Sequence, residues 1–423
     1  MCDYTWITFD MIIENIIEQH AGEVSFLWLL RDKAVHAPHY LLKDLAKLDG
    51  RVEAHIDGLR VAGDVGWEVC KGALGVGESG EVFSAAVLAF ESGDEKRIKA
   101  VLEVVEEKPE SCRGLVSALG WLTWQQAEIH VAKLLTEESP LLRCVGLAAY
   151  AAHCQDPGRA LTDALRDVHP IVRARAIQSV GELGRKDLLP FIQDNLTAKD
   201  EFCRFSAACS ATLLGDAGSA TVLKSFVNKD FPWPEDALKI AMRRMALASA
   251  IDWQAELAKQ ADTMRLAIIA AGAIGDPVLI TWLMEQMTVP ELARVAGESF
   301  TMITVVDIAY ADLDGNRPEG FESGPTENPE DEDVEMDPDE DLPWPKPELI
   351  HAWWEKNRSG FRSGSRYLMG QPITYEQTEN VLRTGRQRQR HAAALELSML
   401  KPGHPLFEVR APGFRQQRML GLK

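Results

Sequence analysis

Three glycines near residue 75 have the spacing of a phosphate-binding loop. Gly75, Gly77 and Gly80 match the pattern GxGxxG, which in dinucleotide-binding proteins follows a strand and opens a helix. Here the glycines precede a helical pattern, but no convincing strand comes before them. We therefore interpret this segment as a loop that joins two helical parts of the chain, and we expect no cofactor there.

Two acidic segments carry the side chains that Ca²⁺ prefers. Asp312, Asp314 and Asn316 resemble the start of an EF-hand loop, but the glycine comes too early and position twelve is Ser323 instead of glutamate. A second set consists of alternating aspartates, namely Asp337, Asp339 and Asp341. Residues 312–347 are rich in Pro, Gly, Asp and Glu, so we expect a solvated acidic linker or surface strap and no metal site. Cation binding stays the alternative.

A basic run near the C-terminus has the residue type that contacts nucleic acid. Arg386, Arg388 and Arg390 lie in residues 348–423, which hold 13 Lys/Arg against 6 Asp/Glu. The whole chain, however, has a net charge of −19, which repels phosphate backbones. We expect this module to dock on the acidic array or on the acidic strap. Nucleic-acid binding through the tail is the alternative.

No recognisable catalytic motif is present. The chain lacks GxSxG, HExxH, GxxxxGK[ST] and any Cys/His metal spacing. His55 is a lone histidine in a helical segment, where a structural role is the more common one. We therefore predict a protein that is not an enzyme and binds no cofactor. The alternative is an enzyme on a helical-repeat scaffold, either like a DNA glycosylase or like a lyase.

The elements that would position any site belong to a repeat. The stretch Ser139-Pro-Leu-Leu-Arg143 recurs as His169-Pro-Ile-Val-Arg173 and, weakened, as Glu201-Phe-Cys-Arg204. The arginines are about 30 residues apart, which is the period of a stacked helix pair. A small, apolar helix follows each arginine, then a break, then a second apolar helix. We expect the arginines to be structural and name Asp167 and Asp200 as candidate partners.

Glycines mark the breaks between the two helices of each pair. Gly93, Gly184, Gly215 and Gly275 lie close to multiples of the period, and aspartate follows three of them. Glycine can end the first helix in the left-handed conformation, and aspartate can cap the second. The sequence thus predicts an all-α protein whose centre is an α-solenoid of seven or eight HEAT-like helix pairs.

Four regions follow from these patterns. We predict an N-terminal helical cap at 1–78, the HEAT-like array at 79–311, the acidic linker or strap at 312–347 and a basic helical module at 348–423. Apolar residues of the last two regions should anchor the chain on the array, so that residues 335–423 form a folded, docked module instead of a mobile tail. These anchors are Leu342, Trp344, Trp353 and Trp354.

Solenoids commonly bind partners on the concave surface, which we expect the second helix of each pair to line. The polar and aromatic residues of those helices are therefore candidates for binding a protein partner. They are Gln193, Asp194, Lys224, Trp253 and Gln254. The array holds 23 Lys/Arg against 31 Asp/Glu, a balance that disfavours a DNA-binding groove.

The N-terminal residues, the apolar stretches and the cysteines indicate the cellular location. The first 20 residues lack a basic n-region, and Asp10 and Glu14 interrupt the apolar run, so they do not form a signal peptide. The chain contains no stretch of about 18 apolar residues, the length that a membrane-spanning helix needs. The seven cysteines are dispersed, as in a reducing compartment. These features predict a cytoplasmic protein.

The repeat resembles the HEAT and lyase-type HEAT-like repeats over about 230 residues. The segments LDGRVEAHIDGLRVAG, GFESGPTENPEDEDVEMDPDEDLPWPKP, LRTGRQRQRHAAALELSML and PLFEVRAPGFRQQR together resemble a bacterial family often encoded beside type VI secretion components, including PAAR-like spike proteins. The resemblance implies an adaptor, chaperone or immunity-type accessory whose partner is a secreted effector or a spike component. It carries no catalytic residues over to this chain.

Overall fold

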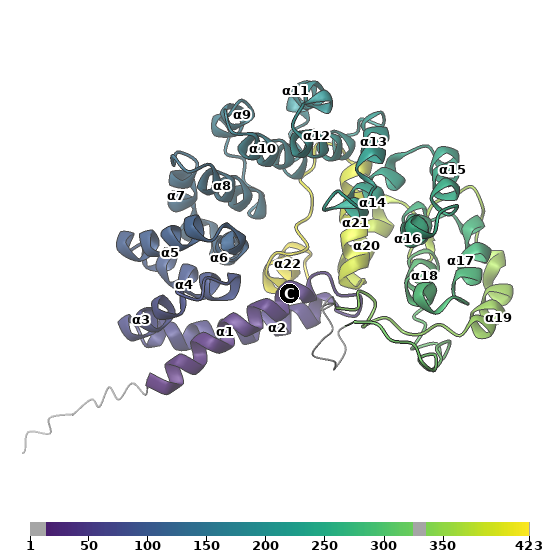
Figure 1. The fold of residues 1–423 in the computed structure, drawn as a ribbon, viewed down its shortest axis with the longest axis horizontal. Coiled ribbons are helices and arrows are strands. Elements are labelled where there is room, and N and C mark those ends of the chain that lie inside the picture. Colours follow the sequence, from purple (N-terminus) through teal and green to yellow (C-terminus); the bar gives the residue numbers. More distant parts are fainter. Residues whose placement is uncertain (1–13, 325–335, 423) are drawn as a thin grey trace, which may run out of the picture.

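The computed structural model describes residues 14–324 and 336–422. Helices dominate this part of the chain, and its strands are β1 (Tyr367–Leu368) and β2 (Gln371–Pro372), a short antiparallel pair in which Leu368 lies opposite Gln371. The helices succeed one another along a strongly curved path, and the C-terminal segment lies within that curve (Figure 1). The predicted all-α solenoid is confirmed.

The first helices of the repeats form an inner layer in which each helix packs against the next. Several of them begin with proline. Proline lacks a backbone N–H, and the N–H at the first helical position would make no hydrogen bond within the helix, so no bond is lost there. The inner helices are α4 (Ser79–Ser92), α6 (Cys112–Trp121), α8 (Pro140–Ala152), α10 (Pro170–Glu182), α12 (Glu201–Leu213), α14 (Pro234–Arg244), α16 (Met264–Ile274) and α18 (Pro290–Thr304).

The second helices form an outer layer on the convex side (Figure 1). They are α5 (Glu95–Glu107), α7 (Trp124–Leu134), α9 (Arg159–Ala164), α11 (Leu189–Asp194), α13 (Ser219–Val222), α15 (Leu247–Leu257) and α17 (Ile280–Gln286). Our expectation that second helices line the concave surface was therefore wrong.

Small residues explain which layer is on the inside. A side chain at Gly181 on α10 would lie 2.6 Å from the Ser210 hydroxyl on α12, and one at Gly272 would lie 2.9 Å from the Ser299 hydroxyl on α18. Both serines also donate to the preceding inner helix: Ser210 to the Ile177 carbonyl at 2.8 Å and Ser299 to the Ile268 carbonyl at 2.9 Å. Such close approach is possible only for small residues, so the helices rich in them occupy the tight side of the curve.

The repeat arginines have one geometry in three successive repeats. The Nη1 atoms of Arg143, Arg173 and Arg204 each donate to the two carbonyls five and six residues earlier, at 2.7–3.1 Å. Arg143 also forms a two-bonded ion pair with Asp167, as expected. Asp200 instead caps α12 by accepting from the Cys203 N–H at 2.8 Å, so it is not an arginine partner. The arginines fix the turn that enters each inner helix.

The glycine breaks have the predicted left-handed backbone. Gly93 and Gly184 both have φ of 67°, Gly215 has 101° and Gly275 has 74°. Gly93 and Gly275 end α4 and α16 directly. Asp94 then accepts the first N–H groups of α5. These positions tolerate a Cβ poorly because of their positive φ.

Three helices precede the array. They are α1 (Glu14–Ala34), α2 (Leu42–Val61) and α3 (Asp64–Ala73). α1 packs against α2, α3 and α4, and the buried side chains of Val24, Leu27 and Trp28 join the core of the first repeats. The array is therefore covered at this end by helices outside the repeat register.

Residues 336–346 lie along the other end of the array. Asp339 forms a two-bonded ion pair with Arg265 of α16 at 2.7 Å, and Asp337 pairs with Arg294 of α18 at 2.7 Å. The Arg294 guanidinium stacks over the Trp344 ring at 4.4 Å, and Leu342 is buried. The described residues 336–346 of the acidic strap therefore dock on arginines of the array.

The C-terminal module consists of α19 (Pro347–Asn357), the β1–β2 pair, α20 (Tyr375–Thr384), α21 (Gln387–Leu400) and α22 (Gly413–Met419). α21 packs on α12 and α14 inside the curve, whereas α22 packs on α2 (Figure 1). The module thereby connects distant repeats with the N-terminal helices. Of the expected anchors, Trp354 is buried, and Trp353 lies edge-to-face with Phe300 of α18.

Candidate protein-interaction surfaces

The concave side of the array is already occupied by the chain's own residues 401–422, which we call the crossing segment (Figure 1). The Leu406 N–H donates to the carbonyl of Glu182, at the end of α10, at 2.8 Å. Farther on, Arg415 donates to the Leu122 carbonyl at 2.8 Å, and the Gly413 N–H donates to the buried carboxylate of Asp49. This segment makes the contacts that a bound peptide would make, so the concave face is not the freely available surface.

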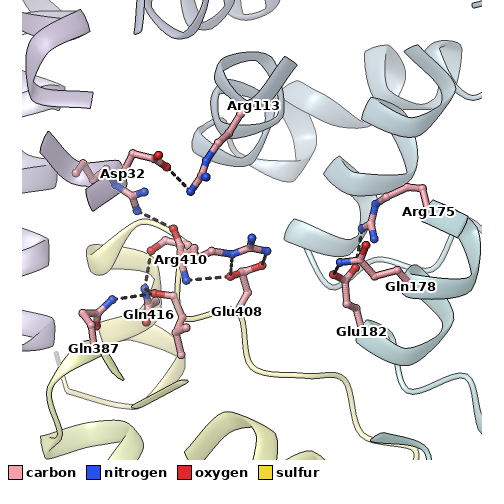
Figure 2. Close-up of polar contacts among 12 residues, drawn as sticks. Asp32, Arg113, Arg175, Gln178, Glu182, Gln387, Glu408, Arg410 and Gln416 are labelled. Atoms are coloured by element: carbon pink, nitrogen blue, oxygen red, sulfur yellow. Dashed lines mark hydrogen bonds and ion pairs between the residues drawn. The ribbon is translucent and has the colours of Figure 1, made fainter. Parts of the chain in front are cut away.

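Charged groups near this segment are paired with one another (Figure 2). Glu408 and Arg410 form two bonds of 2.9 and 2.8 Å, and Arg31 of α1 donates to the Arg410 carbonyl at 2.8 Å. Burial raises the pKa of Glu408, but the Arg410 guanidinium outweighs burial and lowers it to about 2. The Glu408 carboxylate is therefore ionised at neutral pH and fixes the crossing segment.

A second group of paired charges lies on α10 beside the crossing segment. Arg175 donates to Glu182 at 2.6 Å, and Gln178 donates to the other carboxylate oxygen at 2.8 Å (Figure 2). Across the curve, Arg113 of α6 pairs with Asp32 of α1. Burial raises the pKa of Asp32, and Arg113 opposes that change. The Arg113–Asp32 pair joins α6 to α1, whereas the contacts of Arg175, Gln178 and Glu182 lie within α10.

Burial shifts the pKa of several of the described thiols and imidazoles towards the neutral form. Burial raises the pKa of Cys144 and of Cys154 to about 11, so both thiols are protonated at neutral pH. Burial lowers the pKa of His391 to about 3 and that of His153 to about 4, so both imidazoles are neutral. His55 lies 3.0 Å from His20 in a contact between α1 and α2. Residues 14–324 and 336–422 contain no cluster of three His, Cys, Asp or Glu side chains that could hold a metal ion.

The five residues predicted to bind a partner lie on the outer layer and do not form one site. Gln193 and Asp194 are exposed on α11, where Gln193 donates to Asp216 at 2.9 Å. Lys224 lies over the Trp253 ring at 4.8 Å, and Trp253 itself is buried. Gln254 is buried against the Ala267 carbonyl, at 3.4 Å. A role in partner binding for these residues stays a prediction.

The basic run makes internal contacts. Arg386 pairs with Asp307, and Arg388 donates to Glu298 of α18 and to the His36 carbonyl, both at 2.8 Å. Arg390 is fully buried and donates to the Leu382 carbonyl at 2.7 Å. Arg386 and Arg388 thus join the start of α21 to the array and to the loop after α1, as the docking interpretation expected, whereas Arg390 makes its contacts within the C-terminal module.

The alternating aspartates and the GxGxxG loop also contact other residues of the chain. Asp341 lies 3.4 Å from His39, so each of the three alternating aspartates faces a basic side chain. In the GxGxxG loop, Lys108 donates to the carbonyls of Gly75 and Val76 at 3.2 and 2.7 Å. The loop joins α3 to α4, and the Lys108 ammonium group holds its backbone carbonyls.

The outer layer has a shallow groove of about 440 Å³ between α5 and α7. The curvature of the array separates the outer helices while the inner helices stay in contact, and the groove results from that separation. Its floor is apolar and its rim carries both acids and lysines. The lining residues include Ile98, Leu102, Leu134, Glu103, Glu106 and Lys133.

A more distinctive surface is a row of apolar side chains at the entrance to three consecutive inner helices. Ile171 of α10 is 52% exposed, Phe202 of α12 is 42% exposed and Trp233, which precedes α14, is 46% exposed. The Cys203 thiol lies 3.4 Å from the Pro170 carbonyl, so the first turns of α10 and α12 are adjacent. The Phe202 and Trp233 rings lie 5.6 Å apart. We call Ile171, Phe202 and Trp233 the apolar ladder.

The half-buried ring of Phe205 and the buried ring of Phe231 support the ladder from beneath. Phe205 of α12 stacks on Trp233 at 5.7 Å and contacts Phe231 at 4.8 Å. Phe231 is buried and lies 6.2 Å from Phe202. The exposed rings are therefore held in fixed orientations before any partner binds. Sequence reasoning missed the ladder, although Ile171 and Phe202 occupy the same position of the repeated motif.

Comparison with known proteins places part of the array in a recognised class. A family model of HEAT repeats matches residues 158–243, which run from α9 into α14 and include the whole apolar ladder. No curated protein and no solved structure matches the chain. Among the described residues, no helix has the length and apolar character needed to cross a membrane. The centre of this chain is thus similar to HEAT repeats.

Proposed function

We propose that this protein is a non-catalytic scaffold that binds another protein through the apolar ladder. The observation that carries the proposal is the exposure of Ile171, Phe202 and Trp233 at or next to the start of three adjacent inner helices. HEAT repeats commonly serve as surfaces for protein–protein interaction, and the matching segment contains the ladder.

The chemistry of the ladder favours a protein partner. Aromatic side chains with fixed orientation dominate the binding energy of many interfaces, because they bury a large area with little loss of conformational freedom. Large apolar side chains in a row at the surface are also unfavourable in water unless something covers them. Polar and acidic residues such as Asp200, Glu201 and Asp230 flank the ladder and supply the polar rim of such an interface.

The spacing of the ladder limits the shape of the partner. The Phe202 and Trp233 rings lie 5.6 Å apart. A partner helix repeats its face at about 5.4 Å, one turn, when it presents residues three or four apart. We therefore propose an amphipathic helix with apolar residues at i, i+3 or i+4 and i+7 as the bound element.

The finer role follows only from the resemblance of the chain ends to a bacterial family. On that basis the scaffold would be a cytoplasmic adaptor, chaperone or immunity-type accessory of type VI secretion, with a secreted effector or a spike component as its partner. The paired arginines of the tail and the acidic array give no support to the alternatives of a glycosylase or a nucleic-acid-binding protein.

Site-specific photo-crosslinking in native cells tests the proposal. A photoreactive phenylalanine analogue at Phe202 should capture a discrete protein, whereas the analogue at Ile129 should not. Ile129 is a suitable control because it is 63% exposed on α7, away from the ladder. The captured protein should be lost from the Trp233→Ser variant. Identical crosslinks from both positions would contradict the proposal.

A further inference from the structure

One side of the first helix is exposed along its whole length. Asn15, Gln19, Gly22, Phe26, Leu29 and Lys33 recur at alternating intervals of four and three residues and are all exposed. This spacing places them in one stripe on the helix surface. The opposite side of α1 carries Val24, Leu27 and Trp28, which are buried against the array.

The centre of this stripe is apolar. Phe26 is 61% exposed, Leu29 is 40% exposed and the adjoining Leu30 is 36% exposed. Within the described residues, α1 packs on α2, α3 and α4 with its other side, and it lies along the outer edge of the molecule (Figure 1). Three large apolar side chains at i, i+3 and i+4 form the face that helices use to pack on one another.

We propose that this face pairs with the same face of a second copy, so that two α1 helices lie antiparallel around a twofold axis near Phe26. The proposal does not depend on the apolar ladder or on its partner. Such an interface is self-complementary, because each residue contacts the residue at the mirrored position of the other copy. Counting from Phe26, Leu30 of one copy lies opposite Gly22 of the other.

The surface at Gly22 is complementary in shape to the Leu30 side chain of the second copy. A Cβ at this position would meet no atom within 4 Å, so the surface has open space above the glycine. In the antiparallel arrangement the Leu30 side chain of the second copy fills that space. The Phe26 rings meet near the axis. α1 is 21 residues long, or about 31 Å, which is enough for this contact and for polar residues on either side.

The charges along α1 favour the same arrangement. Glu18 is exposed in the first half of the helix and Lys33 in the last turn, and neither has an ion-pair partner among the described residues. Antiparallel pairing brings Lys33 of one copy next to Gln19 and Glu18 of the other. Parallel pairing would instead place like charges together. A second copy therefore complements this face in shape and in charge.

Analytical ultracentrifugation of the full chain tests the proposal. The wild-type protein should sediment as a dimer in the micromolar range. Phe26→Glu combined with Leu30→Glu should raise the dimer dissociation constant at least about tenfold. Ile129→Glu, a matched apolar-to-acid change on exposed α7, should leave it unchanged. A wild-type monomer up to about 100 µM would overturn the proposal, and circular dichroism verifies that the variants are folded.

A charge exchange tests the direction of the two helices. Glu18→Lys and Lys33→Glu should each weaken the dimer, and the double variant should restore it, because each new pair again joins opposite charges. Failure of the double variant to recover would exclude antiparallel pairing. Phe26→Cys should form a disulfide between copies under oxidation, since this residue lies near the axis, and Ile129→Cys should not. Equal crosslinking of both variants would contradict the assignment.

Discussion

The Arg243 guanidinium of α14 and the Glu396 carboxylate of α21 form an ion pair of 2.9 Å, with both side chains buried. These residues are 153 positions apart in the chain. Their contact ties the C-terminal module to the inner layer of the array. A buried charge that loses its partner is strongly unfavourable, so this pair makes the docking of α21 specific.

We expect Glu396→Gln to lower the free energy of unfolding by about 3 kcal/mol, because the buried Arg243 charge then has no carboxylate partner. Glu103→Gln is the control, since Glu103 pairs with Lys99 at 3.6 Å on an exposed surface and should contribute less than about 1 kcal/mol. Denaturant unfolding followed by circular dichroism measures both values. Equal effects would mean that the buried pair does not hold the module.

Two glycines with the same φ angle allow the effect of backbone strain on stability to be measured apart from the effect of losing the contact with residues 401–410. Gly93 and Gly184 both have φ of 67°, but a Cβ at Gly93 meets nothing within 4 Å, whereas one at Gly184 lies 2.6 Å from the His404 carbonyl. Gly93→Ala should destabilise by about 1 kcal/mol through backbone strain alone. Gly184→Ala should destabilise more and should also expose residues 401–410.

Hydrogen exchange measured by mass spectrometry distinguishes the two glycine variants. Residues 401–410 should exchange faster only in Gly184→Ala. If both variants show the same stability and the same exchange in that segment, the close approach of the crossing segment to α10 is not important for the fold.

Acid should destabilise the protein through His391 on α21. Burial lowers the pKa of this imidazole from 6.5 to about 3, so the unfolded chain binds a proton that the folded chain does not bind. The contribution of His391 to stability is therefore complete above about pH 6.5 and declines as the pH falls towards 3.

Thermal unfolding between pH 7 and pH 4 measures this effect. His391→Gln should lose less stability over this interval than the wild type does. His404→Gln is the comparison, because His404 is exposed in the crossing segment. Parallel curves for the wild type and His391→Gln would show that His391 titrates normally.

Limited proteolysis should cut first within about residues 315–335, a span that lies partly outside the described residues. The strap beyond it is held by the Arg265–Asp339 and Arg294–Asp337 pairs and by buried Leu342. After cleavage the two fragments should stay associated and should co-migrate in native mass spectrometry. Rapid digestion from Glu348 onward, with the array intact, would show that the C-terminal module is not docked.

Local features of the sequence predicted local structure. Proline and arginine predicted the entrances of α8 and α10, and the glycines have the left-handed angles that their spacing indicated. The tryptophans after residue 340 were expected to anchor the strap, because a tryptophan side chain buries a large area at little entropic cost. Trp344 does stack on Arg294.

Contacts between residues far apart in the chain had no such pattern in the sequence. The bond from Arg31 to the Arg410 carbonyl spans 379 positions and follows no periodicity, so the crossing of the concave face could not be predicted. The small residues of the first helices did indicate that these helices lie on the inner side of the curve, but we had not used them to predict it. Glycine and serine at facing positions, such as Gly181 and Ser210, permit the closest packing and so belong on the tight side of the curve.

The most direct test of the scaffold function is the affinity for the protein captured at Phe202, measured by isothermal titration calorimetry with purified components. Binding should weaken at least about a hundredfold when Phe202→Ser and Trp233→Ser are combined, since the two aromatic anchors are then lost. Ile129→Ser should bind as the wild type does. Undiminished affinity of the double variant would contradict the claim that the apolar ladder is the binding surface.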